Sequence, residues 1–456
     1  MRSMHRKILW ALAITAVAPL VGACATPTPE TIIEQVVVTE IVEVRGETTF
    51  VEVTATPRGK CSPTDVAGLE VLKIGVPVPL SAPGSVIEGR AMQTAINIAV
   101  DDINTGGGVL GLPVDVVFYD TSALPERGTA AMEYFATQEC VVAVVGEYHS
   151  AAGVAMKEIS NKYHIPTILQ TWDDSITGVG YSEVFRVAPT SSIVAEADAN
   201  FIESLGAEFV VIMTESTDYG IPAAEATTAK LNARGIESET YQADPGTQDF
   251  SSVIASIQEG PVPDVVLVLV TGETSYNFEQ QAAEAGLMPT ADTVCIAYEA
   301  AAKSTDYWTN VPDGNYCTFR QVGLVPALAN DLTKAFEAEY RKHFDTFPES
   351  YALEAYDSLR IMADAINRAG SIDADAIISA LEATDIQGTL GRLYFPYGAD
   401  NPVPSEMPDY MWHQWPDPAV LFLQYFEDGQ SRDDAAVVYP EIYWTHGGFI
   451  PFGETP

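Results

Sequence analysis

Apolar and polar residues follow two alternating patterns from about residue 71 to residue 300. Short and nearly continuous apolar runs, such as 71–78 and 264–270, are typical of strands buried on both faces of a sheet. The segments between such runs place apolar residues on one side of a helix, as Met92, Ile96 and Ala99 do. This alternation predicts an α/β protein whose parallel sheets are covered by helices on both faces.

The same patterns give the extent of each predicted element. Strands are expected at 71–78, 113–119, 141–145, 166–169, 208–213, 236–242, 264–270, 293–297 and 420–426. Helices are expected before Gly106 and at 125–139, 150–163, 192–205, 221–234, 250–258, 276–285, 328–344, 350–369 and 374–383. Two successive sets of units, in a chain of 456 residues, predict two doubly wound lobes.

The first 60 residues follow a different pattern. Basic residues precede an apolar run over 8–20, which is too short to cross a membrane and is typical of a secretory signal. The sequence Leu-Val-Gly-Ala-Cys over 20–24 resembles a bacterial lipobox, which implies removal of 1–23 and lipidation of Cys24; an ordinary signal peptide is the alternative. We interpret 24–60, rich in Val, Glu and Thr between Pro-containing ends, as a lipid anchor and stalk, either locally β-like or disordered.

Composition narrows the range of partners. A net charge of −40 repels the phosphates of nucleic acids and anionic lipid headgroups, so we expect no nucleic acid partner and membrane contact only through the anchor. Four cysteines remain after Cys24, and in an exported protein they can form disulfides in three pairings. We favour Cys61–Cys140 and Cys295–Cys317, because the second pair lies close in sequence within one predicted lobe. No Cys-x-x-Cys spacing indicates a metal site, and none is expected.

A series of short motifs occurs in order between about 71 and 430. The motifs are PLSAPG (79–84), DINTGGGVLG (102–111), VVG followed by Ser150 (144–150), FRVAP (185–189), TDYG (217–220), PGTQDF (245–250) and YALEAYD (351–357). Together they resemble the branched-chain amino acid, amide and urea-type solute-binding proteins of ABC transporters, the Leu/Ile/Val-binding protein-like family.

The resemblance implies a type I periplasmic binding protein fold. One lobe would comprise 71–189 plus 320–393, and the other 190–319 plus 394–456, joined by a hinge of three crossovers. It also implies that the lobes close over a small solute and that the closed form docks on the permease subunits. We expect a monomer, with no cofactor.

Ligands of open parallel sheets bind beyond the carboxyl ends of the strands. The residues that follow the predicted strand ends are therefore the expected ligand-binding residues: Tyr148, Ser150, Ala151, Gln170, Thr171, Trp172, Tyr219, Thr271, Gly272 and Glu299. Ser150 begins a predicted helix, so its hydroxyl and the neighbouring N–H groups can hold a carboxylate or carbonyl; a simple N-cap is the alternative.

The chemistry of the ligand stays open among several classes. The resemblance implies that Glu299 pairs with a ligand ammonium, whereas a solvated loop carboxylate is the alternative. Tyr148, Trp172 and Tyr219 can supply aromatic walls, or can belong to the core. Trp172 stands where amino-acid-binding relatives carry a hydroxyl donor, which leaves an amide, a urea-like compound or an aromatic acid as open as an amino acid.

Enzyme signatures are absent from the sequence. It contains no Gly-x-Ser-x-Gly elbow, phosphate-binding glycine loop or His-Glu-x-x-His helix, and the neighbouring pair Glu147 and His149 belongs to no motif that activates a nucleophile. We therefore predict a binding protein, located outside the cytoplasm as a periplasmic or cell-surface lipoprotein that delivers its solute to an ABC importer. The alternative is a sensory module that presents its solute to a receptor.

Overall fold

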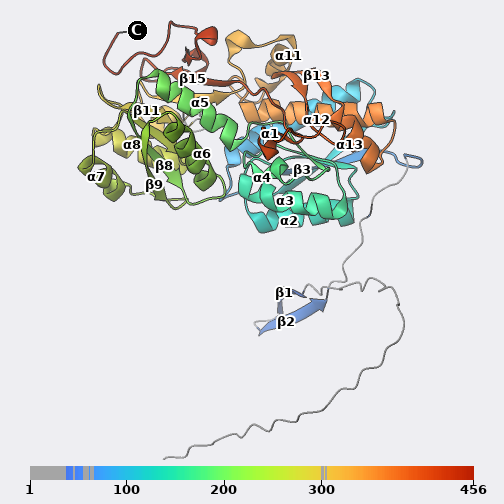
Figure 1. Cartoon of the computed structure of the whole chain (residues 1–456). Coiled ribbons are helices and arrows are strands. Elements are labelled where there is room, and N and C mark those ends of the chain that lie inside the picture. The colour runs from blue at the N-terminus through green and yellow to red at the C-terminus, as the bar shows by residue number, and fades with distance from the viewer. Residues whose placement is uncertain are drawn as a thin grey trace, which may run out of the picture. The chain divides into compact units, whose positions relative to one another are not determined.

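The computed structural model describes residues 37–44, 47–54, 61, 66–298, 302 and 306–455. The chain forms two compact units, Met1–Gly59 and Lys60–Pro456. In the first unit, β1 (Val37–Val44) pairs antiparallel with β2 (Glu47–Thr54), so this part of the predicted stalk is β-structured (Figure 1). The predicted signal peptide and the lipidation site Cys24 lie outside the described residues.

The second unit begins with a five-stranded parallel sheet of order β4-β3-β5-β6-β7. Four of its strands are almost entirely buried, because helices cover both faces, whereas the edge strand β4 is mostly half-buried. The strands are β3 (Leu72–Val78), β4 (Val114–Asp120), β5 (Ala143–Gly146), β6 (Thr167–Leu169) and β7 (Val184–Arg186). The helices that alternate with them are α1 (Val86–Thr105), α2 (Pro125–Tyr134), α3 (Ser150–Tyr163) and α4 (Ser175–Gly178).

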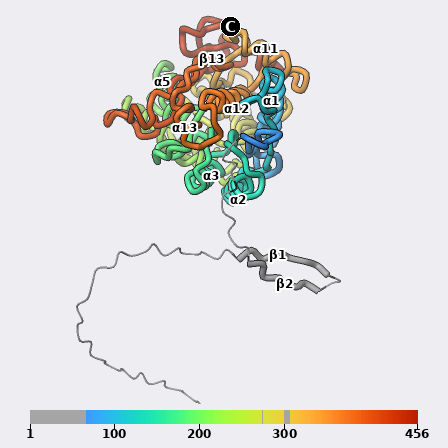
Figure 2. Tube along the Cα trace, turned by 90° about the vertical axis from the view of Figure 1, so that its right-hand side faces the viewer, coloured from blue at the N-terminus to red at the C-terminus, as the bar shows by residue number. Residues whose placement is uncertain are grey.

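Three helices from much later in the chain complete this first lobe. They are α11 (Asp331–Tyr340), α12 (Ser350–Ala369) and α13 (Ala374–Glu382). The long helix α12 lies against α1, and its apolar face joins the same hydrophobic core as β3 and β5 (Figure 1, Figure 2). The hairpin of β13 (Asp385–Gly388) and β14 (Gly391–Tyr394) follows them.

A seven-stranded sheet of order β16-β15-β12-β11-β10-β8-β9 forms the core of the second lobe. Five strands are parallel: β8 (Phe209–Glu215), β9 (Glu237–Ala243), β10 (Val265–Leu269), β11 (Val294–Ala297) and β12 (Thr318–Val322). At one edge, β15 (Val420–Gln424) pairs antiparallel with β12, and β16 (Ala436–Tyr439) pairs antiparallel with β15. The helices of this lobe are α5 (Ser191–Ser204), α6 (Gly220–Ala233), α7 (Ser251–Glu259), α8 (Glu273–Glu284) and α10 (Tyr307–Asn310).

The chain passes between the two sheets three times: after β7, after β12 and before β15. One predicted boundary differs from the structure, because Phe395 and Trp415 pack in the core of the first lobe although 394–456 was expected in the second. The buried guanidinium of Arg186 accounts for part of this difference. Its Nε donates to Gln414 Oε1, and its backbone N–H donates to the carbonyl of His413.

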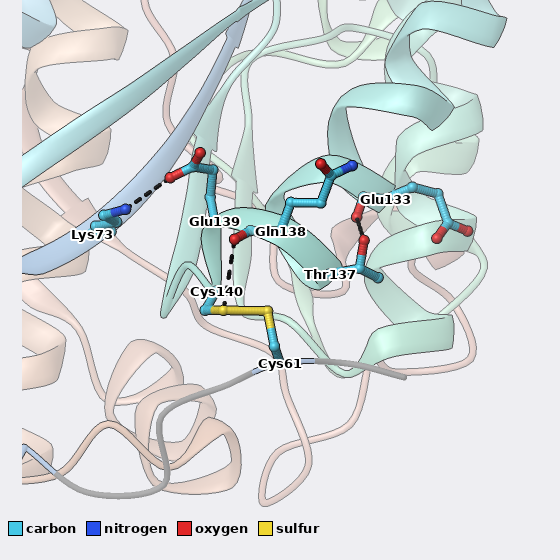
Figure 3. The surroundings of a disulfide bond; sticks show 7 residues. All are labelled: Cys61, Lys73, Glu133, Thr137, Gln138, Glu139 and Cys140. Carbon is cyan, nitrogen blue, oxygen red and sulfur yellow. Dashed lines mark hydrogen bonds and ion pairs between the residues drawn. A yellow bond between two sulfur atoms is a disulfide. The ribbon is translucent and has the colours of Figure 1, made fainter. Parts of the chain in front are cut away.

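Two disulfides join the four remaining cysteines in the pairings that the sequence favoured. Cys61 is bonded to Cys140, with Cα atoms 5.0 Å apart, and ties the start of the second unit to the first lobe (Figure 3). The second disulfide joins Cys295 in β11 to Cys317, which directly precedes the neighbouring strand β12, with Cα atoms 4.8 Å apart. Within the described residues, no helix is long and apolar enough to cross a bilayer.

Candidate ligand-binding site

A small pocket lies between the two lobes, at the carboxyl ends of their parallel strands. Its volume is about 30 Å³. The first lobe contributes residues that follow β5 and β6, and the second lobe contributes residues that follow β8, β10 and β11. The lining residues are Tyr148, His149, Ser150, Trp172, Tyr219, Thr271 and Tyr298.

Aromatic side chains from opposite lobes meet across this pocket. The hydroxyl groups of Tyr148 and Tyr298 are hydrogen-bonded at 2.9 Å, and Trp172 packs edge-on against Tyr219 with ring centroids 6.1 Å apart. Burial raises the pKa of Tyr298 well above its ordinary value, so this hydroxyl stays neutral and can donate or accept. The two contacts bring the lobes together around the pocket.

Ser150 is the first residue of α3, and its hydroxyl oxygen accepts hydrogen bonds from a neighbouring loop instead of capping the helix. Its Oγ accepts hydrogen bonds from the backbone N–H groups of Trp172 and Asp173, both at 3.2 Å. The N-cap position belongs to His149, so the simple N-cap alternative for Ser150 does not apply. Because both lone pairs are used, the Ser150 hydroxyl can offer only its hydrogen to a ligand.

Thr271 has the opposite hydrogen-bonding role, because its N–H and its hydroxyl both donate to a buried carboxylate. Its backbone N–H donates to Glu215 Oε2 at 2.9 Å, and its hydroxyl donates to Glu215 Oε1 at 2.9 Å. Glu215 ends β8 and also accepts from the Thr217 hydroxyl at 3.0 Å. Burial raises the pKa of Glu215, while these hydrogen bonds oppose that shift. The lone pairs of the Thr271 oxygen therefore remain available as acceptors.

The loop that carries Tyr148 is held by buried polar contacts. Glu147, at φ +66°, accepts from the N–H groups of Tyr148 and His149 at 3.0 and 2.8 Å. His149 Nε2 accepts the N–H of Ser85 at 3.2 Å, so the neutral ring carries its proton on Nδ1. Burial lowers the pKa of His149 to about 4 and raises that of Glu147 to about 7. The two side chains thus shape the loop and do not form an acid–base pair.

The predicted residues divide into three groups. Tyr148, Ser150, Trp172, Tyr219 and Thr271 line the pocket. Gln170 and Thr171 are buried behind it: the Gln170 amide donates to the Tyr351 carbonyl, and Thr171 packs on Gly153. Ala151, inside α3, is not among the described lining residues, Gly272 lines an adjoining cavity, and Glu299 lies outside the described residues.

Sequence reasoning did not select His149, Tyr298 or Glu215. Tyr298 follows the apolar strand β11 directly, which is the same signal that selected the other residues at strand ends. Its backbone N–H donates to the buried Glu279 Oε1 at 3.0 Å, which anchors it at that end of the sheet. Glu215 is the last residue of β8, which is apolar from Phe209 to Met213, and its buried position was not apparent from the sequence pattern.

A larger cavity of about 490 Å³ adjoins the pocket and shares His149 and Thr271 with it. It lies between the N-terminal end of α1 and the second-lobe loops that contain Gly246 and Gly272. Glu88, Glu215 and Glu349 contribute carboxylates to it, and its described lining contains no lysine or arginine. Glu349 also forms an ion pair with Arg432, which offsets its charge.

Comparisons with known proteins agree with this architecture. Residues 71–408 match the family of periplasmic binding proteins. The Leu/Ile/Val-binding protein homolog 7 of Brucella abortus is 26% identical over 371 residues, covering 76% of this chain and 89% of that protein.

Two solved structures show the same fold. The substrate-binding protein LivJ from Streptococcus pneumoniae, in complex with isoleucine, has a TM-score of 0.67 at 22% identity and covers 81% of this chain and 100% of its own. A solute-binding protein from R. palustris, in complex with benzoate, has a TM-score of 0.66 at 19% identity and covers 79% of this chain and 94% of its own. The chain therefore belongs to the periplasmic binding protein family, whose members are substrate-binding proteins and not enzymes, and has the type I fold of that family.

Proposed function

We propose that this protein is the extracytoplasmic solute-binding lipoprotein of an ABC importer, which captures a small amino acid, amide or related organic solute between its lobes and delivers it to the permease. The observation that carries the proposal is the pocket lined from both lobes by aromatic rings and by hydroxyl groups of opposite polarity. The relatives named for leucine, isoleucine and valine, and the neighbours that hold isoleucine or benzoate, support this range of ligands.

The aromatic residues would bury the apolar part of the solute. Tyr148 and Trp172 belong to the first lobe, and Tyr219 and Tyr298 to the second, so a bound solute would contact both lobes at once. A ligand that contacts both lobes stabilises the closed state over the open state by its differential affinity. The three chain crossings would act as the hinge of this closure, with lobe boundaries near those predicted from the sequence.

Hydrogen bonds would orient the solute inside the pocket. The Ser150 hydroxyl would donate to a carboxylate or carbonyl oxygen of the ligand, since its lone pairs are already used. Glu299, which follows the described part of β11, would pair with an ammonium group if the ligand carries one. Lipidation at Cys24, with the segment 24–60 as a stalk, would keep the monomeric protein at the membrane surface near its permease.

A binding screen tests the proposal. Isothermal titration and thermal shift of the purified protein against leucine, isoleucine, benzamide, urea and benzoate should identify at least one ligand. A solute at a hundred times its Kd should stabilise the protein by about 2.7 kcal/mol. Ser150→Ala should weaken binding about tenfold, because one hydrogen bond to a ligand oxygen is lost. The matched control is Ser252→Ala, an exposed serine on α7 that should leave binding unchanged.

Absence of binding across the panel would count against the proposed ligand classes. Delivery needs a separate measurement: the ligand-loaded protein should stimulate ATP hydrolysis by its cognate permease complex in liposomes. Chemical turnover of a bound solute would contradict the assignment to the binding proteins.

A further inference from the structure

We propose that the ligand must carry an N–H donor, which the Thr271 hydroxyl oxygen recognises because the buried Glu215 carboxylate holds that hydroxyl as an acceptor. This inference rests on the proposed function, since it concerns the solute of the same pocket. It selects amino acids and amides from the classes that the proposed function leaves open, and it assigns a specificity role to Glu215.

The geometry around Glu215 leaves Thr271 a single hydrogen-bonding role. The side chain of Glu215 is 3% exposed, and the Thr271 hydroxyl lies 2.9 Å from Oε1 and 3.0 Å from Oε2 of this carboxylate. The backbone N–H of Thr271 is bound to Oε2 at 2.9 Å, which fixes the residue in place. A hydroxyl that donates to a carboxylate cannot donate to a ligand, but its oxygen still accepts.

The opposite wall of the pocket has the complementary role. Both lone pairs of Ser150 Oγ accept backbone N–H groups, so this hydroxyl can only donate to a ligand. The Thr271 hydroxyl already donates to Glu215, so its oxygen can only accept from a ligand. Ser150 of the first lobe therefore presents a donor, and Thr271 of the second lobe presents an acceptor. A carboxylate or carbonyl oxygen beside Ser150 and a nitrogen-bound hydrogen beside Thr271 would satisfy both walls in one ligand.

The charge around the site favours the same chemistry. Thr271 and Glu215 both line the larger adjoining cavity, whose described lining contains no lysine or arginine. An ammonium group would be attracted there, whereas a second anionic oxygen of a simple carboxylic acid would face the Thr271 oxygen and the Glu215 charge. Repulsion of this kind supplies specificity against ligands that lack the donor.

Paired ligands that differ only in the N–H group test the inference. Leucine is compared with 4-methylpentanoate, and benzamide with benzoate, by isothermal titration of the full-length protein. We expect the member with the N–H group to bind about tenfold or more tightly in at least one pair. Thr271→Val should abolish this preference, because the acceptor oxygen is lost, whereas Thr271→Ser should retain it.

Glu215 and its other partner supply the remaining variants. Glu215→Gln removes the charge and should weaken the binding of leucine more than the binding of benzamide. The ammonium group of leucine depends on that charge more than a neutral amide does. Thr217→Val is the matched control, since Thr217 also donates to Glu215 but is not among the residues that line either cavity. Its ligand preference should equal that of the wild type.

The outcomes separate this inference from the proposed function. If benzoate and 4-methylpentanoate bind as tightly as their partners, and Thr271→Val changes nothing, the solute-binding function stands and the N–H requirement is wrong. If none of the four compounds nor any other solute of the panel binds, the proposed function fails and the inference fails with it. The inference is supported if the preference for the N–H ligands is lost in the Thr271→Val protein, if Glu215→Gln weakens the binding of leucine more than that of benzamide, and if Thr217→Val behaves as the wild type.

Discussion

The hydroxyl of Tyr148 in the first lobe is hydrogen-bonded to the hydroxyl of Tyr298 in the second, at 2.9 Å. The two residues are far apart in sequence: Tyr148 lies two residues after the end of β5, and Tyr298 directly follows β11. Their contact spans the pocket, so it belongs to the geometry in which the lobes are close together. It is a direct target for testing how the lobes are held in this arrangement.

Tyr298→Phe should weaken the closed arrangement by about 0.5–1.5 kcal/mol, because one hydrogen bond between the lobes is removed while the ring remains. The measurements are the ligand Kd and the radius of gyration by small-angle X-ray scattering, which should both increase in the variant at limiting ligand. Tyr181→Phe, which removes a hydrogen bond to the exposed side chain of Glu158, serves as the control. Equal effects of both substitutions would show that the contact between the lobes has no special role.

The buried ion pair of Arg320 and Asp198 should be essential to the stability of the second lobe. Their side chains are 2% and 1% exposed, with Nη1 and Oδ2 2.7 Å apart. Asp198→Ala should reduce the free energy of unfolding by about 3–5 kcal/mol, because it leaves a buried guanidinium without its carboxylate. Urea denaturation measures this loss.

The same substitution should also affect the pocket. Arg320 Nη2 approaches the Tyr219 hydroxyl at 3.5 Å, so a displaced guanidinium would disturb one aromatic wall. Glu339→Gln, which breaks the exposed pair with Lys342, is the control and should cost less than about 1 kcal/mol. A loss in the Asp198→Ala protein as small as that of the control would contradict the assignment.

Stability should fall as the pH rises through neutrality. Burial raises the pKa of Glu147 to about 7 and that of Glu279 to about 8, from an ordinary value of 4.5. Between pH 4.5 and 8 the folded protein therefore binds more protons than the unfolded chain, and the free energy of unfolding decreases with pH. Thermal unfolding between pH 6.5 and 9 should show a falling Tm, and Glu279→Gln should flatten this slope.

Histidine acts in the opposite direction at lower pH. Burial lowers the pKa of His149 to about 4, so the unfolded chain takes up a proton first as the pH falls below about 6.5. The stability that neutral His149 provides is therefore complete above pH 6.5 and is lost between pH 6.5 and 4.

The prediction for Glu279 has its own contrary outcome. If the Tm of the Glu279→Gln protein fell with pH as steeply as that of the wild type above pH 6.5, Glu279 would not be the buried group that titrates.

Removal of the Cys61–Cys140 disulfide should destabilise the second unit more than removal of Cys295–Cys317. The sequence separations are 79 and 22 residues, and the chain-entropy account gives about 4–5 kcal/mol for the longer loop and about 3 kcal/mol for the shorter. Paired Cys→Ser variants compared by urea denaturation measure both losses. A greater loss for the shorter loop would show that local packing, rather than loop length, determines the effect.

The sequence alone determined the repeated strand–helix units and the positions of most pocket residues. Helices α3 and α12 have the predicted bounds, because their apolar spacing and flanking residues are unambiguous. Tyr148, Trp172 and Thr271 were found because each follows an apolar strand, and strand ends of a parallel sheet meet at one edge.

The sequence pattern did not predict β12, and the reason is visible in its side chains. Thr318–Val322 includes Arg320 and Gln321, both buried, so the strand lacks the apolar run typical of its neighbours. Arg320 is paired with Asp198 from α5, far along the chain, and the Gln321 amide donates to the carbonyl of Leu324. A buried charge of this kind is compatible with a strand only after the partner is in place.

Tertiary structure alone decided which residue at each strand end faces the ligand. Gln170 and Thr171 turn behind the pocket while Trp172 lines it, and Glu215 lies under Thr271 from a different strand. Neighbouring residues point to different sides according to strand register, sheet twist and loop conformation, and these depend on contacts between distant segments. The sequence therefore determined where the site lies, and the packing of the two lobes decided which of its groups donate and which accept hydrogen bonds.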